Sequence, residues 1–238
     1  MSKSYYSLGL MSGTSMDGVD ASLIKSDGLS KYNTISNKYF EYDKNLYQNL
    51  TNIRDKISNS KDLEILSNDL KSIEKEITLF HAKVVNEITK ESTFEIDFIG
   101  FHGQTIFHNA DEKISRQLGD GKLLSQLTKK TVVYNFREND LNNGGEGAPL
   151  SPIFHQLIVK ENKIDLPVCV LNIGGIANIT AIGSNEPKDL KSYDIGPGNC
   201  LIDEWIRKKT KKKYDDNGQT AKTGKTSEII LNQALDNF

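Results

Sequence analysis

The feature that most constrains the fold of this chain is a strand, glycine turn and strand pattern that occurs twice. Residues 8–24 start with apolar residues, pass through a loop of Gly, Ser and Thr, and return to apolar residues. Residues 168–182 repeat this design in different residues, with Gly174 and Gly175 at the turn. Two such hairpins in one chain indicate an internal structural repeat. We therefore expect two related α/β halves.

The order of elements between the hairpins predicts the fold of the first half. Between residues 62 and 91, Leu and Ile recur at three- and four-residue steps, which is typical of an amphipathic helix. The expected elements are three strands, this helix, a strand, a short helix and a strand, at residues 5–10, 19–25, 31–42, 62–91, 96–101, 123–128 and 131–134. This order is that of the ribonuclease-H-like fold.

The second half begins in the same way but does not continue. After a helix expected at residues 149–159, the second hairpin is followed by a strand at 192–195 and a helix at 200–209. Beyond residue 210 we expect only a basic run, a polar loop and a helix over 226–238. The predicted fold class is one complete copy of an α/β, actin-like fold plus a truncated second copy. The predicted domains are residues 1–160 and 161–238, and the chain is either a fragment or completed from elsewhere.

Composition narrows the function classes. The chain has 238 residues, of which 37% are hydrophobic and 26% charged, with a formal net charge of −2. Such a charge argues against binding polyanions through bulk charge, and the basic run at 207–213 lacks the interleaved aromatics of a nucleic-acid site. Two cysteines do not make a disulfide framework, and no apolar run approaches the length of a membrane span. We expect a cytoplasmic protein without nucleic-acid or membrane partners.

The loop of the first hairpin, with Gly, Ser and Thr between buried strands, is typical of an anion site. Its backbone N–H groups and hydroxyls are not covered by bulky side chains, which suits a phosphate group. Asp17 can hold Mg²⁺ against phosphate oxygens, because magnesium prefers carboxylate, water and phosphate ligands. The alternative is an ordinary hairpin with a polar turn.

Polar residues follow two of the predicted strands, at the strand ends where α/β sheets bind ligands. His102 and Gln104 can hydrogen-bond a sugar hydroxyl or amide, or can simply cap a loop. Arg137 can grip a carboxylate or phosphate, and the glycines at residues 144–147 allow close approach of the backbone. The alternative for this second segment is a flexible linker. His102 and His108 do not form a metal pair, because no nearby carboxylate or thiolate completes a ligand set.

Asp194 is the candidate catalytic residue. It is expected at the end of a strand, before the turn Gly196-Pro197-Gly198 that opens a helix. A carboxylate in that place can accept a proton from a nucleophile. The alternative is a buried structural Asp that caps the helix. Gly224-Lys225-Thr226 is not a phosphate-binding P-loop, because its glycine spacing is wrong and no strand precedes it.

Five segments in the same order resemble the anhydro-N-acetylmuramic acid kinase family of the actin-like ATPase and sugar kinase superfamily. They are Gly9–Ala21, Gly100–Thr105, Phe136–Pro152, Leu171–Asn178 and Asp194–Asn199. The resemblance implies a cytoplasmic enzyme of cell-wall recycling that uses ATP and Mg²⁺, and it suggests a homodimer. The implied reaction opens the anhydro sugar with water and phosphorylates it to N-acetylmuramic acid 6-phosphate.

The resemblance also implies roles for single residues. Asp194 would be the base that deprotonates water, and His102, Gln104, Arg137 and Asp140 would line the sugar side. The ATP phosphate loop would consist of Gly13, Thr14, Ser15, Met16, Asp17, Gly18, Val19 and Asp20. Family members are longer and carry a late glycine-rich segment for adenosine, which this sequence lacks after Gly198. The alternative function is therefore a truncated, non-catalytic remnant that binds sugars or muropeptides.

Overall fold

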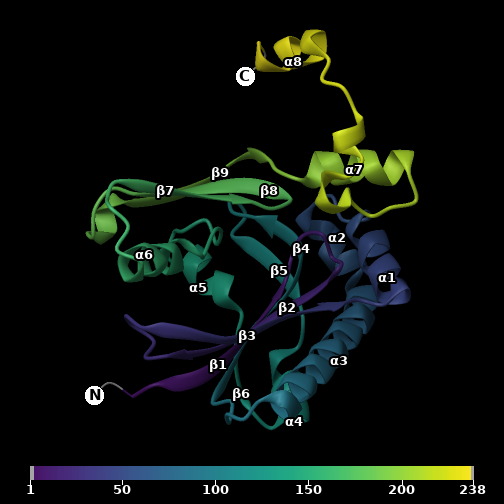
Figure 1. The fold of residues 1–238 in the computed structure, drawn as a ribbon. Helices are drawn as coiled ribbons and strands as arrows, with labels where there is room; N and C mark the ends of the chain where they lie inside the picture. Colours follow the sequence, from purple (N-terminus) through teal and green to yellow (C-terminus); the bar gives the residue numbers. More distant parts are fainter. Residues whose placement is uncertain (1–2, 237–238) are drawn as a thin grey trace. The chain divides into compact units, whose positions relative to one another are not determined.

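The first hairpin is the centre of a six-stranded mixed sheet in the computed structural model, which describes residues 3–236 (Figure 1). The sheet order is β3-β2-β1-β4-β5, and β6 pairs with β4. β1 is antiparallel to β2 and parallel to β4, which is parallel to β6. The strands are β1 Tyr5–Ser12, β2 Gly18–Ser26, β3 Tyr32–Glu41, β4 Phe98–Asn109, β5 Ile114–Leu118 and β6 Thr131–Tyr134. This arrangement confirms an α/β fold with a mixed sheet and is consistent with the predicted actin-like class.

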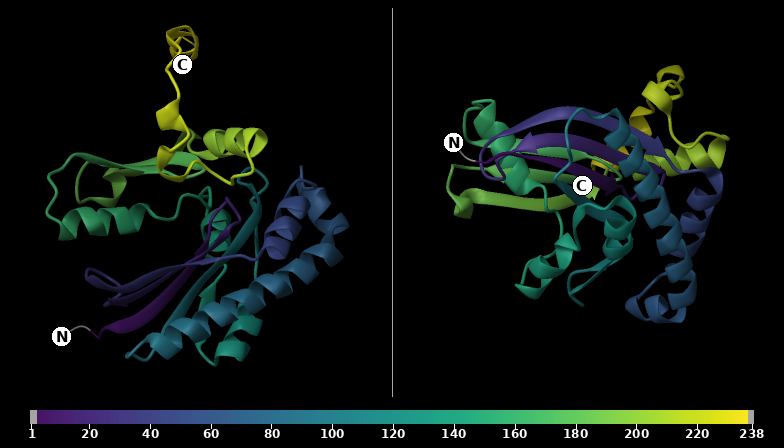
Figure 2. Two further views of the ribbon diagram at one scale, coloured as in Figure 1. Left: turned by 45° about the vertical axis from the view of Figure 1, so that its right-hand side comes forward. Right: turned by 90° about the horizontal axis from the view of Figure 1, so that it is seen from below.

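The core of this sheet follows from the alternation of apolar residues along its strands. In β1, Leu8 and Leu10 are buried while Gly9 and Met11 are exposed, as the two-residue period of a strand requires. The buried face packs with the apolar sides of α1 (Lys44–Arg54), α3 (Ser67–Glu91) and α4 (Gly121–Thr128) in one continuous core. Figure 2 shows α3 running beside the sheet with α1 against it.

The helix predicted over residues 62–91 is two helices. α2 (Ser60–Ile65) begins at a capping box formed by Asn59 and Asp62, and Leu66 separates it from α3. Leu66 has φ −92° and ψ 14°, outside the helical region. A change of backbone conformation at one residue leaves the side-chain periodicity intact, so the apolar pattern did not indicate the break. The sequence prediction also missed α1, whose N-cap is Asp43.

β4 is twice as long as the strand predicted at residues 96–101, and it includes His102 and Gln104, which the sequence analysis placed after the strand. The first part of β4 pairs with β1 and β6, and its last part, from Gln104 onward, pairs with β5. β5 was not predicted, and it supplies the hydrogen-bonding partner that keeps the chain extended. Gly103 has φ +71°, and a Cβ there would lie 2.5 Å from the carbonyl oxygen of Leu118. The close approach of β5 therefore requires glycine at this position.

The segment after β6 is more helical than predicted. α5 (Phe136–Asn142) includes Arg137 and Asp140, and a glycine loop then leads to α6 (Pro152–Glu161). Pro152 lies in the first turn of α6, where its missing N–H costs nothing. The helix predicted from residue 149 thus begins three positions later.

The chain divides into two compact units. The first comprises Met1–Val170 and Thr180–Tyr193, and the second comprises Leu171–Ile179 and Asp194–Phe238. A second sheet has the order β7-β8-β9, with strands Val168–Ile173, Ile176–Ile182 and Leu190–Pro197. α7 (Cys200–Lys209) matches its prediction, and α8 (Glu228–Leu235) lies within the predicted helix. Short 3-10 helices occur at Pro187–Asp189, Asp216–Gly218 and Ala221–Thr223.

Two predictions about the second half of the chain are not tested by these elements. The truncated second copy and the domain boundary at residue 160 remain predictions. Among the described residues, no helix is long and apolar enough to span a membrane.

Candidate functional site

The loop between β1 and β2 is a tight turn anchored by Met16. Met16 has φ +58°, and its amide donates to the carbonyl oxygen of Gly13 at 3.1 Å. Its side chain is buried in the core, whereas Thr14 and Ser15 are exposed. A left-handed residue next to right-handed ones turns successive backbone amides toward one side, as in the backbone concavities that bind anions in other proteins. The loop therefore presents two hydroxyls and its backbone around a buried anchor.

Asp17 lies at the end of this loop, and one of its carboxylate oxygens already accepts a hydrogen bond within the loop. Ser15 Oγ donates to Asp17 Oδ1 at 2.5 Å, and the amide of Tyr42 donates to the Asp17 carbonyl oxygen at 2.8 Å. Asp20 is exposed on β2, and partial burial together with the charge of Asp17 raises its pKa.

The remaining two residues of the predicted phosphate loop, Gly18 and Val19, are packed against neighbouring parts of the fold. Val19 is fully buried in the core. A Cβ at Gly18 would lie 2.4 Å from the carbonyl oxygen of Phe40, so this position has no room for a side chain. Neither residue can offer a side chain to a ligand.

Gln104 connects β4 to the same loop. Its side chain is completely buried, and Nε2 donates to the carbonyl oxygen of Gly13 at 2.8 Å. Its Oε1 is also buried and has no hydrogen-bond partner among the described residues. A buried amide oxygen without a partner costs free energy, so the hydrogen bond to Gly13 has to offset that cost. Gln104 thus holds the loop rather than offering an open amide.

His102 and Arg137 form a partly buried pair. His102 Nε2 accepts from Arg137 Nε at 3.2 Å and Nη2 at 2.9 Å. His102 Nδ1 lies 2.7 Å from the carbonyl oxygen of Gly103, so it carries the proton and donates. Burial and the charge of Arg137 lower the pKa of His102 to about 4, and burial also lowers the pKa of Arg137. The imidazole is therefore neutral at physiological pH and acts as an acceptor for the guanidinium.

Arg137 and Asp140 also build the glycine loop that follows α5. Arg137 Nη1 donates to the carbonyl oxygen of Gly147 at 2.6 Å, and the amide of Gly147 donates to Asp140 Oδ2 at 2.8 Å. A Cβ at Gly145 would lie 2.2 Å from the same carboxylate oxygen. The structure therefore brings His102, Arg137, Asp140 and the glycine loop together in one connected cluster.

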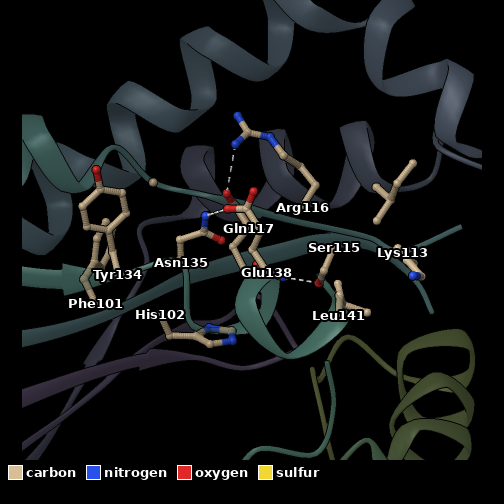
Figure 3. Close-up of a pocket in the computed structure, with 12 residues that line it drawn as sticks. Phe101, His102, Lys113, Ser115, Arg116, Gln117, Tyr134, Asn135, Glu138 and Leu141 are labelled. Atoms are coloured by element: carbon tan, nitrogen blue, oxygen red, sulfur yellow. Dashed lines mark hydrogen bonds between the residues drawn. The ribbon is translucent and has the colours of Figure 1, made fainter. Parts of the chain in front are cut away.

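A pocket of about 360 Å³ lies beside His102 (Figure 3). The lining residues come from β4, β5, β6, α5 and the connections next to them: Phe101, His102, Lys113, Ile114, Ser115, Arg116, Gln117, Gly119, Tyr134, Asn135, Glu138 and Leu141. Asn135 Nδ2 donates to the carboxylate of Glu138, and both residues line the pocket. Sequence reasoning missed Ser115, Arg116 and Gln117 because it did not predict β5. These three polar residues are consecutive, so no alternation of apolar and polar residues indicated the strand.

Asp194 is an exposed residue of β9 in the second unit. β9 continues to Pro197, so Asp194 does not end the strand as predicted. The N-cap of α7 is Asn199, which shows that the alternative of a buried Asp capping the helix is wrong.

The turn after β9 packs on the second glycine hairpin. The amides of Gly198 and Asn199 donate to the carbonyl oxygens of Gly175 and Gly174 at 2.9 and 2.7 Å. A Cβ at Gly198 would lie 2.2 Å from the Gly174 oxygen, so this contact requires glycine. The backbone after Asp194 is thereby held close to the hairpin.

The comparison with known proteins decides the family. The sequence model of the anhydro-N-acetylmuramic acid kinase family matches residues 5–238. The chain belongs to this family. Among curated relatives, the anhydro-N-acetylmuramic acid kinase of Pelagibacter ubique is 64% identical over 238 residues, covering 100% of this chain and 64% of the relative. That of Agrobacterium fabrum is 40% identical over 225 residues, covering 91% of this chain and 59% of the relative.

A third relative, from Rhizobium etli, is 37% identical over 233 residues, covering 96% of this chain and 62% of the relative. The chain therefore spans about three fifths of the length of these kinases. The resemblance read from the five sequence segments is confirmed. The roles of the single site residues stay predictions.

Proposed function

We propose that this protein acts as an ATP-dependent kinase of peptidoglycan recycling. In this reaction, anhydro-N-acetylmuramic acid is opened by water and phosphorylated to N-acetylmuramic acid 6-phosphate. The observation that carries the proposal is the turn at Gly13–Asp17, with its exposed hydroxyls and buried Met16 anchor, in a chain of this family. Phosphoryl transfer needs positioning and charge stabilisation more than covalent chemistry, and a preformed loop supplies both.

The phosphate groups of ATP would bind at this loop through backbone amides and the hydroxyls of Thr14 and Ser15. Among residues 3–236, no group of three or more His, Cys, Asp or Glu side chains could hold a metal ion. Magnesium does not need such a group, because it is often bound through one carboxylate together with phosphate oxygens and waters. Asp17 would supply that carboxylate, and the ion would neutralise charge on the transferring phosphoryl group.

Asp194 would act as the general base. Water attacks the anomeric carbon, its proton passes to the Asp194 carboxylate, and the bond from this carbon to the bridging oxygen breaks. The freed 6-oxygen then attacks the γ-phosphorus, and ADP leaves. The exposure of Asp194 supports this role, because a base must reach the water it deprotonates.

The sugar would bind beside the cluster of His102, Arg137 and Asp140. The neutral His102 and the Gly147 carbonyl oxygen accept three N–H groups of the Arg137 guanidinium, which carries five donors. The two remaining donors suit the carboxylate of a muramic acid. Gln104 would act through its hydrogen bond to the phosphate loop.

The test is ADP release by the purified protein with the anhydro sugar, ATP and Mg²⁺. We expect turnover only when all three are present. Asp194→Asn should lower turnover by about a hundredfold or more, since a positioned base contributes at least that factor. Sugar binding, measured by calorimetry, should persist in this variant.

The exposed Glu161→Gln serves as the control and should leave turnover unchanged. Sugar binding without any ADP release by the unmodified protein would instead support the non-catalytic remnant. Full activity of Asp194→Asn would remove Asp194 from the proposed mechanism.

A further inference from the structure

Three buried polar side chains from three separate parts of the chain meet behind the Gly13–Asp17 loop. Ser12 is the last residue of β1, Tyr42 follows β3, and His81 lies in the middle of α3. Their exposed fractions are 1%, 2% and 0%. Burying polar groups in a core is costly unless they are hydrogen-bonded, so this cluster calls for a reason beyond packing.

The hydrogen bonds of the cluster run in one direction. His81 Nδ1 lies 2.8 Å from the carbonyl oxygen of Ile77, which can only accept, so Nδ1 carries the proton. Nε2 is then an acceptor for Ser12 Oγ at 3.3 Å. Tyr42 Oη, 2.8 Å from Ser12 Oγ, donates to that oxygen in turn. The order is Tyr42 to Ser12 to His81 to the helix backbone.

This polarity is stable at physiological pH. Burial lowers the pKa of His81 to about 4 and raises that of Tyr42, so the imidazole and the phenol are both neutral. The chain of bonds ends at a main-chain carbonyl and offers a proton no further acceptor. The network therefore does not move protons and acts through geometry.

The same three residues hold both ends of the Gly13–Asp17 loop. Ser12 precedes Gly13, so its hydroxyl fixes the point where the chain enters the loop. At the other end, the amide of Tyr42 donates to the Asp17 carbonyl oxygen at 2.8 Å. The ring of Tyr42 packs on Phe80 with 4.9 Å between centroids, and that of His81 packs on Phe101 at 4.9 Å. Entry and exit of the loop are thus tied to one rigid helix.

We propose that Ser12, Tyr42 and His81 are positioning residues that hold the Gly13–Asp17 loop in the shape that binds a polyphosphate. This inference rests on the proposed function. A loop held in its bound shape loses less conformational entropy on binding, so the network raises affinity without touching the ligand. Losing one of its hydrogen bonds should weaken nucleotide binding by about tenfold, the effect of a single buried hydrogen bond.

The decisive variant is Tyr42→Phe, which removes only the hydroxyl and keeps the ring and the backbone amide. His81→Leu removes the acceptor for Ser12, and His81→Gln restores an acceptor at that point. The matched control is Thr78→Val on the same helix, because Thr78 is equally buried but accepts from the amide of Asp120, away from the loop.

Two measurements are needed: hydrogen–deuterium exchange of residues 13–18 without ligand, and the Kd for MgATP by calorimetry. We expect Tyr42→Phe and His81→Leu to speed exchange of the loop and raise Kd by about tenfold. His81→Gln should recover much of the loss. Thr78→Val should lower Tm without changing either readout.

Each outcome decides a separate point. If Tyr42→Phe lowers Tm as Thr78→Val does but leaves loop exchange and Kd unchanged, the network is only structural and the inference is overturned. Should His81→Leu fail to fold, Tyr42→Phe still decides. If the unmodified protein does not bind MgATP while Tyr42→Phe still speeds exchange of the loop, the proposed function is wrong. The conclusion that the three residues hold the loop in place is then still supported.

Discussion

The two glycine hairpins share a sequence design but differ in what lies beneath them. The first, at residues 8–24, rests on a core of helices, and its strand residues Leu8 and Leu23 are buried. In the second hairpin, Ile173 and Ile176 are 57% and 50% exposed. Among the described residues, a buried polar network lies behind the first loop, whereas the second turn is held by the backbone amides of Gly198 and Asn199. The layer packed behind a glycine turn thus decides how firmly the turn is held.

The largest expected difference between the hairpins is in core truncation. Leu8→Ala should lower the free energy of unfolding by about 3 kcal/mol, because it leaves a cavity in a packed core. Ile173→Ala should cost less than about 1 kcal/mol, because much of that side chain already contacts solvent. Urea unfolding of both variants measures this contrast. Equal losses would show that the second hairpin has a core of its own.

The next contrast is in the glycines themselves. A Cβ at Gly18 would meet the Phe40 carbonyl oxygen at 2.4 Å, whereas a Cβ at Gly174 would meet its nearest neighbour at 3.6 Å. Gly18→Ala should therefore cost about 1–3 kcal/mol of stability, as overpacking does. Gly174→Ala should stay within about 0.5 kcal/mol. Tm measurements on the two alanine variants suffice, and a neutral Gly18→Ala would mean that β3 shifts easily.

The third contrast is in pH dependence, because the four histidines all lie in the first compact unit. His81 and His102 have folded-state pKa values lowered to about 4 by burial, below the 6.5 of the unfolded chain. Between pH 6.5 and 4 the unfolded state binds more protons, so stability is full above this window and falls as pH drops through it. Each histidine contributes a slope of at most about 1.4 kcal/mol per pH unit.

This pH prediction is checked by urea unfolding at pH 7 and pH 5. His102→Gln should show a shallower loss of stability between the two pH values than the unmodified protein. The exposed Asn172→Ala, which removes no titratable group, should keep the original slope. An unchanged slope in His102→Gln would mean that His102 is not buried as a neutral group.

The smallest effect on stability is expected at the loop surface. Ser15→Ala removes an exposed hydrogen bond to Asp17 and should change the free energy of unfolding by less than about 0.5 kcal/mol. Its Kd for MgATP should rise by several-fold, because a hydroxyl and an oriented carboxylate are lost together. Asn172→Ala, an exposed change in the second hairpin, is the control for stability. Unchanged MgATP binding in Ser15→Ala would argue against this loop as the phosphate site.

The site residues divide according to how far their surroundings could be predicted. The Gly13–Asp17 loop was identified from its small residues between two apolar runs, and the structure places it at that turn. Gln104 was expected to face a ligand from a loop but is buried in a strand and bonded to Gly13. That difference comes from β5, a short strand without a strong apolar pattern, whose pairing extended β4. Pairing between segments leaves no periodic signal in either one.

The sequence by itself determined the α/β character, the two glycine turns and the family, because these depend on local periodicity and on short motifs, although it missed α1 and β5. Only the tertiary structure decided that His81, distant in sequence, lies behind the loop, and that Arg137 pairs with His102. Such contacts depend on which helix face and which strand register meet across the core. Hydrophobic patterning favours burial of a face but does not specify its neighbours, so the polar partners of a buried group emerge only when the chain is packed.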